Sequence, residues 1–118
     1  MMGRKAIEFT PYTQFPAEPV PGPAKGITQR IISKDPQGRA LSRIIEYEAG
    51  TDTTPNGTAV HDYWEEVFIL KGKMIDLTLN QTFSAGDTAS RPPGMPHGPW
   101  KIPEHTVIYE VDYYVKED

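Results

Sequence analysis

Proline limits what this chain can fold into more than any other residue type. Of the 118 residues, 12 are prolines, about twice the usual share of ~5%. Because proline lacks a backbone N–H and its ring clashes with the preceding helical turn, long helices have little room. Most of the prolines lie in residues 11–23 and 92–103, with Pro36 and Pro55 elsewhere. The sequence therefore predicts a fold of strands and turns.

From Gly26 onward, short apolar segments alternate with glycine and other turn residues. Apolar and polar side chains alternate over residues 75–79, and Gly72 within residues 71–73 predicts a hairpin turn before them, with one buried face. The pattern gives seven or eight strands and no helical stripe, which favours an antiparallel sandwich or barrel with protected edges. The other predicted strands cover residues 27–33, 40–48, 67–70, 88–91 and 106–115.

Four charged residues interrupt these apolar strands, namely Arg43, Glu46, Glu110 and Asp112. Alternation along an antiparallel strand usually directs such side chains to solvent. A polar pocket inside the fold would instead draw some of them inward. Both interpretations stay open on the sequence alone.

The N-terminal segment, residues 1–25, has isolated aromatic residues (Phe9, Tyr12 and Phe15) but no periodicity. Such a proline-rich segment is typical of an extended arm that lies on another surface. We expect one barrel domain over residues 26–118, because a chain of this length buries enough surface for a single core. The arm, or the strand at Ile27, is expected to cover a sheet edge of a second copy in a homodimer. A frayed terminus is the alternative.

The charge balance narrows the possible partners. There are 12 lysines and arginines against 16 acidic residues, and the net charge is −4, so the electrostatic pattern of nucleic-acid binding is absent. Without cysteine there are no disulfides or thiolate metal sites. No apolar run is long enough for a membrane helix or a signal peptide. We expect a cytoplasmic protein whose partner is a small molecule, with no nucleic acid and no membrane.

One segment has glycine, proline and histidine at informative spacings. Gly86 is followed after five residues by Pro92, after one more by Gly94, and after two more by His97. This spacing resembles the second sequence motif of the cupin superfamily. Where that motif often continues to an asparagine, this chain has Lys101.

A second segment resembles the first cupin motif, which has two histidines separated by one residue, then three residues, a glutamate, six residues and a glycine. Counting back from Gly72 places the glutamate at Glu65 and the second histidine at His61. The first histidine position is Ala59. One usual ligand of the family is therefore absent.

The first motif leaves alternatives for its ligands. A shifted loop would recruit Tyr63 or Asn56 in place of the absent histidine. If His61 is instead the first histidine and Tyr63 replaces the second, the acid moves to Glu66, but the spacing to Gly72 is then broken. The spacing favours Glu65 over Glu66.

The resemblance covers roughly residues 26–115 and is strongest to the branch that includes anti-sigma-factor cupin domains and diketone-cleaving dioxygenases. It implies an all-β fold, a small antiparallel jelly-roll barrel, holding one divalent metal ion (Fe, Zn, Mn or Ni) on His61, Glu65 and His97. On a straight strand, His61 and Glu65 would stand about 13 Å apart at ~3.3 Å per residue. We therefore expect the chain to bend at residues 62–64, so that both side chains reach one ion.

The resemblance leaves three functions open. The first is a metal-dependent dioxygenase acting on a diketone or hydroxyketone. The second is a non-redox metal-dependent isomerase or cyclase. The third is a non-catalytic cupin that binds a metal or a ligand, or has a degenerate site. The residues predicted to line a substrate pocket are Tyr63, Trp64, Met95 and Trp100.

Overall fold

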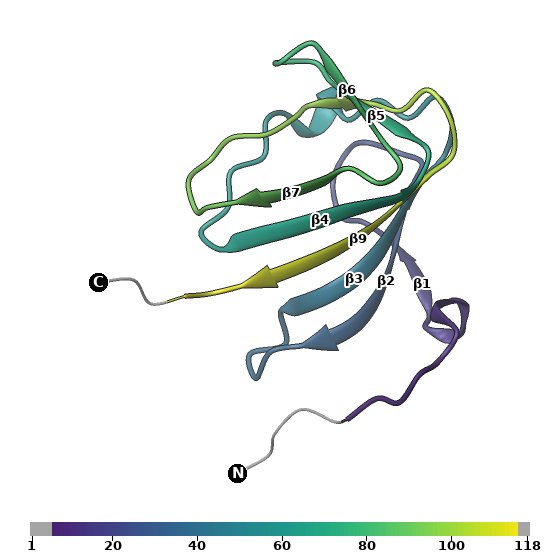
Figure 1. Ribbon diagram of the computed structural model, residues 1–118, viewed down its shortest axis with the longest axis vertical. Helices are drawn as coiled ribbons and strands as arrows, with labels where there is room; N and C mark the ends of the chain where they lie inside the picture. The colour runs from purple at the N-terminus through teal and green to yellow at the C-terminus, as the bar shows by residue number, and fades with distance from the viewer. Residues whose placement is uncertain (1–5, 116–118) are drawn as a thin grey trace.

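The computed structural model describes residues 6–115. Residues 1–5 of the predicted arm and 116–118 of the predicted barrel domain lie outside the described residues. The described part forms two antiparallel sheets (Figure 1). The larger sheet has the order β1 (Ala17–Pro19), β2 (Ile27–Lys34), β3 (Ala40–Tyr47), β9 (Thr106–Tyr113), β4 (Trp64–Lys71) and β7 (Thr88–Arg91), and the smaller has the order β6 (Gln81–Ser84), β5 (Lys73–Asp76) and β8 (Trp100–Lys101).

Helix is nearly absent, as the proline content predicts. Between residues 6 and 115, the helical elements are two single 3₁₀ turns, η1 (Tyr12–Gln14) and η2 (Thr54–Asn56). No helix in this range is long and apolar enough to cross a membrane. The prediction of an antiparallel all-β fold is confirmed, although strand pairing does not close the two sheets into one barrel.

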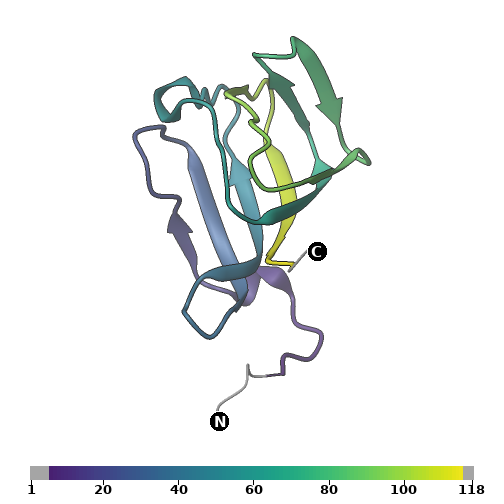
Figure 2. The same ribbon diagram turned by 90° about the vertical axis from the view of Figure 1, so that its left-hand side faces the viewer.

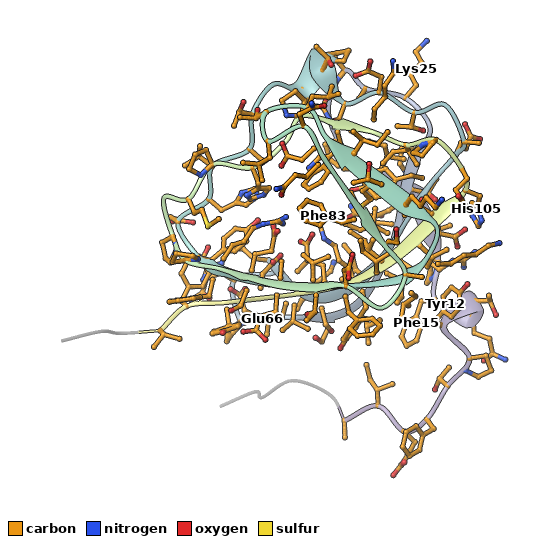
Figure 3. All side chains as sticks on the ribbon, turned by 45° about the horizontal axis from the view of Figure 1, so that its top comes forward. Tyr12, Phe15, Lys25, Glu66, Phe83 and His105 are labelled. Carbon is orange, nitrogen blue, oxygen red and sulfur yellow. The ribbon has the colours of Figure 1, made fainter. Side chains whose placement is uncertain are left out.

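One apolar core joins the two sheets. The smaller sheet lies beside the larger one in Figure 2, and side chains from both contribute to the core. In Figure 3, Phe83 of the smaller sheet points into the space between the sheets, and Glu66 points away from it. The buried core residues are Ala24, Ile27, Ile45, Tyr47, Val67, Ile69, Met74, Ile102 and Ile108.

Gly72 carries the chain from one sheet to the other. β4 pairs with β7 and β9, whereas β5 pairs with β6 and β8, so the predicted hairpin at residues 71–73 is wrong. The φ of Gly72 is +90°, and a Cβ there would lie 2.5 Å from the carbonyl oxygen of His105 and closer still to Thr106. Glycine is required by both the backbone angle and the close approach.

The strand after this crossing is shorter than the predicted alternation. β5 ends at Asp76, whose carboxylate accepts hydrogen bonds from the backbone N–H groups of Thr78 and Leu79, each at 2.9 Å. These bonds turn the chain. Met74 and Asp76 are buried, whereas Leu77 and Leu79 are exposed. The predicted buried face of residues 75–79 is therefore wrong, because the turn formed by Asp76 replaces the second half of the strand.

The larger sheet has a charged region on its inner face. Glu110 and Asp112 are buried, and Arg43 lies opposite Glu110 in the register of β3 and β9 and contacts it. Glu46, by contrast, is partly exposed and lies 3.0 Å from the ring Nε2 of His105. The pocket interpretation therefore holds for Arg43 and Glu110, which line a cavity, and the solvent interpretation holds for Glu46. Asp112 points inward but does not line the cavity.

The N-terminal segment runs along β2. β1 pairs with β2, and the Nη1 of Arg30 donates to the backbone carbonyls of Thr13 and Phe15, at 2.9 and 2.5 Å. Tyr12 and Phe15 lie outside the two sheets in Figure 3. Phe9 is fully exposed. Homodimerisation through this segment stays a prediction, which sedimentation at micromolar concentration tests.

Candidate metal centre

A bend in the backbone brings His61 next to Glu65. Residues 62–63 form the bend and β4 begins at Trp64, so the expected corner is present. Glu65 points inward from the start of β4 and is 4% exposed. The Nε2 of His61 lies 3.4 Å from the Oε2 of Glu65. Four residues of chain therefore place both groups at one point, which a straight strand could not do.

His97 reaches the same point from the proline-rich loop. Its backbone forms a two-way bridge with Ala59, at 2.8 and 3.0 Å, and the N–H of Gly94 donates to the carbonyl of His61 at 2.8 Å. These bonds tie the loop to the segment before β4. The Nε2 of His97 lies 3.6 Å from the Oε1 of Glu65.

The ring of His97 is oriented by its other nitrogen. Its Nδ1 lies 3.3 Å from the carbonyl oxygen of Met95. A hydrogen bond from Nδ1–H to a carbonyl leaves the Nε2 lone pair free for a metal, an arrangement usual for ligating histidines. The ring of His61 stacks on Tyr63 with 4.6 Å between centroids, which holds it in place.

The three side chains fit a divalent ion. One donor atom from each of His61, Glu65 and His97 can be chosen so that all lie within 4.8 Å of one another. Two donors that bind one ion at about 2.1 Å stand at most about 4.2 Å apart. The Nε2 of His61 is 3.4 Å from the Oε2 of Glu65 and the Nε2 of His97 is 3.6 Å from its Oε1, so each histidine meets that limit at a different carboxylate oxygen. Burial, then Arg91 and His61, lowers the pKa of His97 to about 4, and burial lowers the pKa of His61. Both imidazoles are therefore in the neutral form that binds metals.

Arg91 contacts the carboxylate of this set. It lies opposite Glu65 in the register of β4 and β7, and its Nη1 donates to the Oε1 of Glu65 at 2.8 Å. Its guanidinium also lies over the ring of Trp100, 5.5 Å from the centroid. Burial, followed by the charge of Glu110, raises the pKa of Glu65, and Arg91 opposes that rise.

The alternative ligands of the first motif make other contacts, and the ring of Tyr63 stacks on that of His61. Glu66 points outward and accepts hydrogen bonds from Ser90 and Tyr113. The Oδ1 of Asn56 accepts the backbone N–H of Ala24 at 2.8 Å. Glu65 is thus the acid that meets the histidines, as the preferred spacing predicts.

A cavity of about 240 Å³ opens beside the three donors. Its apolar wall includes Ile45, Val67, Ile69, Met74, Phe83 and Ile108, and its polar end is formed by Arg43, His61, Glu65, Arg91, His97 and Glu110. Of the predicted pocket residues, Trp100 lines this cavity, whereas Tyr63, Trp64 and Met95 do not. Trp64 stacks on Tyr113, and Met95 is 44% exposed.

Arg91 and Tyr47 both line the cavity, although the sequence motifs do not mark either one as a site residue. The alternation within the strand at residues 88–91 places Ala89 and Arg91 on one face, which was the available signal. It does not say whether that face points inward. The cavity lining shows that it does.

A second acidic group lies deeper in the fold. Donor atoms of Glu65, Glu110 and Asp112 also fall within 4.8 Å of one another. Arg43 neutralises Glu110 with two hydrogen bonds to its Oε2, at 3.0 and 2.7 Å, and donates to Gln29 at 2.5 Å. The Oδ1 of Asp112 is buried without a hydrogen-bond partner. Burial and then Glu110 raise the pKa of Asp112, so this carboxyl is held as a neutral acid.

Comparisons with known proteins give the fold its name. The sequence matches no protein-family model, and no curated protein matches it. Solved structures do match over nearly the whole chain. An acetylacetone dioxygenase from Acinetobacter johnsonii has a TM-score of 0.72 and 20% identity, over 99% of this chain and 83% of that one.

Two further structures are similar to the same extent. The polyketide cyclase RemF from Streptomyces resistomycificus has a TM-score of 0.70 and 19% identity, over 96% of this chain and 89% of that one. An RmlC-like cupin from Shewanella frigidimarina has a TM-score of 0.71 and 16% identity, over 99% and 98%. The two antiparallel sheets packed around one core have a jelly-roll architecture. The chain has the cupin fold.

Proposed function

We propose that the protein is a mononuclear metalloenzyme that holds one divalent ion on His61, Glu65 and His97 and acts on a small organic molecule in the adjoining cavity. The observation that carries the proposal is the convergence of these three donors at the polar end of the cavity. Ala59 lines the same cavity and bridges to His97, so its methyl group leaves space where the motif usually supplies a fourth ligand.

When bound to two imidazoles and one carboxylate, a divalent ion offers open coordination positions, as in non-haem Fe(II) oxygenases, or acts as a Lewis acid if it is zinc. The protein's own groups prepare the site for either chemistry. The carbonyl of Met95 orients the ring of His97, and before the ion binds, Arg91 orients the carboxylate of Glu65. The apolar wall offers contacts to the hydrocarbon part of a substrate.

The first reaction proposed is oxidative cleavage of a diketone or hydroxyketone, with O₂ as oxidant and source of the new oxygen atoms. The donor set supports it, since two histidines and one carboxylate are a ligand pattern of non-haem Fe(II) oxygenases. The apolar wall would hold the carbon skeleton of a substrate whose two oxygens could chelate such an ion. The similarity to an acetylacetone dioxygenase concerns the fold.

A non-redox isomerase or cyclase is the second candidate, because acid and base groups also line the cavity. Glu110 is buried there beside Arg43, and the hydroxyl-bearing Tyr47 lies in the same wall. Burial raises the pKa of Tyr47, so its phenol stays protonated and can donate a hydrogen bond. Such groups serve proton transfer at a bound carbonyl compound.

Metal analysis tests the site itself. Purified protein is depleted with a chelator, reloaded with Zn(II) or Fe(II) and assayed for bound metal. We expect one ion per chain, and loss of most of it in His97→Ala with the circular dichroism spectrum retained. His105→Ala is the matched control, because His105 is partly exposed and pairs with Glu46 outside the cavity. Full metal occupancy in His97→Ala contradicts the ligand assignment.

Oxygen consumption separates the two reactions. Metal-free protein is loaded with Fe(II) under anaerobic conditions, mixed with a panel of diketones and hydroxyketones, and then exposed to oxygen. Uptake that requires both substrate and His97 supports the dioxygenase. Absence of uptake across the panel, with tight zinc in the isolated protein, refutes the dioxygenase and favours the non-redox enzyme. Substrate that is consumed without oxygen uptake indicates the non-redox enzyme, and bound metal with neither oxygen uptake nor loss of substrate indicates a binding protein.

A further inference from the structure

Arg91 lies where its guanidinium can contact either Glu65 or a ligand in the cavity. Its side chain is 14% exposed and is held between the Oε1 of Glu65 at 2.8 Å and the ring of Trp100 at 5.5 Å. All three residues line the cavity. The guanidinium of Arg91 is therefore the cation that pairs with Glu65 in the metal-free protein. Under the proposed function, a metal ion binds the same carboxylate.

The charges at the polar end of the cavity balance in pairs. Arg43 pairs with Glu110 at 2.7 Å, and Arg91 pairs with Glu65 at 2.8 Å. A divalent ion on the His61, Glu65 and His97 set adds two positive charges. Asp112, the remaining buried carboxyl of this region, offsets at most one of them. The metal-loaded cavity is thus positively charged in a setting of low dielectric, where an uncompensated charge is costly.

The size and walls of the cavity define what can supply the missing negative charge. A volume of about 240 Å³ is somewhat below the ~300–1,000 Å³ of sites that hold drug-sized ligands, so a small organic molecule fits. Met74, Phe83 and Trp100 contribute apolar surface to its walls. A ligand with one negative charge and a short branched hydrocarbon tail meets both requirements.

We propose that Arg91 couples metal binding to the binding of a small organic monoanion, a carboxylate or an enolate. This inference rests on the proposed metal site. When the ion takes the charge of Glu65, the guanidinium of Arg91 becomes available to donate hydrogen bonds to the anion beside the ion, and Trp100 covers the anion's tail. Without the ion, Glu65 retains Arg91 and the anion binds weakly.

The probes are 3-methylbutanoate and 3-methylbutanamide, which match in shape and differ in charge. Their binding to zinc-loaded and chelator-treated protein is measured by calorimetry. We expect zinc-loaded protein to bind the carboxylate at least tenfold more tightly than the amide, and the chelator-treated protein to lose that preference. Arg91→Gln is expected to lose it with zinc present, and Arg91→Lys to keep part of it. Arg39→Gln is the control, because Arg39 lies outside the cavity and is half exposed.

Linkage gives a second readout on the unaltered protein. If the carboxylate binds more tightly in the presence of zinc, it must raise the affinity for zinc by the same factor, which competition with a chelator measures. Equal binding of carboxylate and amide, an Arg91→Gln variant that keeps the preference, or carboxylate binding unaffected by zinc each overturns the inference while the metal site stands. A wild-type protein that takes up no zinc overturns the metal site and the inference together.

Discussion

Arg43 neutralises a carboxylate that has almost no access to water, so removing it should be costly. Glu110 is 5% exposed, and its Oε2 receives hydrogen bonds from both the Nε and the Nη2 of Arg43. Arg43→Met keeps much of the apolar stem but leaves that oxygen without its donors, beside buried Asp112. Breaking a buried ion pair by removal of one partner costs about 3–5 kcal/mol. We expect the free energy of unfolding to fall by that amount.

Urea unfolding of chelator-treated protein at pH 8, followed by tryptophan fluorescence, measures this loss. Lys73→Met is the control, because Lys73 and Glu104 pair at 3.9 Å with both side chains more than half exposed, and exposed pairs contribute at most about 1 kcal/mol. Arg43→Met combined with Glu110→Leu should recover most of the stability, since an apolar replacement of a buried pair is often neutral. An Arg43→Met loss no larger than that of Lys73→Met would refute the reasoning.

Three further predictions follow from single positions. Gly72→Ala should destabilise the protein by about 1–3 kcal/mol more than Gly86→Ala in the same urea assay, because overpacking costs that amount. Both glycines have positive φ, but of the two only Gly72 lacks space for a Cβ; equal losses would contradict the contact with His105 and Thr106. In chelator-treated protein, the pKa of Asp112 is raised above its value in the unfolded chain. Its contribution to the free energy of unfolding is therefore fully present at acid pH and is lost as pH rises, at up to about 1.4 kcal/mol per pH unit. Asp112→Asn should flatten the pH dependence of the free energy of unfolding above pH 5, and an unchanged slope would count against a neutral Asp112. Ala59→His places a fourth donor beside His97 and should slow the removal of zinc by a chelator at least tenfold, whereas Val60→His, at an exposed position, should leave the rate unchanged.

Local sequence determined the strands and most of the donor set. The strands at residues 27–34, 40–47 and 88–91 follow from apolar runs bounded by turn residues, which act over a few positions. The approach of His61 to Glu65 is also local, because a bend over two residues suffices to bring them together. The spacing of glycine and proline before His97 indicated the loop that brings it to the same point.

The tertiary structure alone decided which face of each strand points inward. A period of two separates the faces of a strand but does not orient them, so the inward positions of Arg43 and Glu110 depend on the pairing of β3 with β9. The pairing of β5 with β6 and β8 likewise depends on segments distant in sequence. Arg91 meets Glu65 because the register of β4 and β7 sets them opposite one another across 26 positions. Such contacts arise from long-range packing, and no local pattern of residues records them.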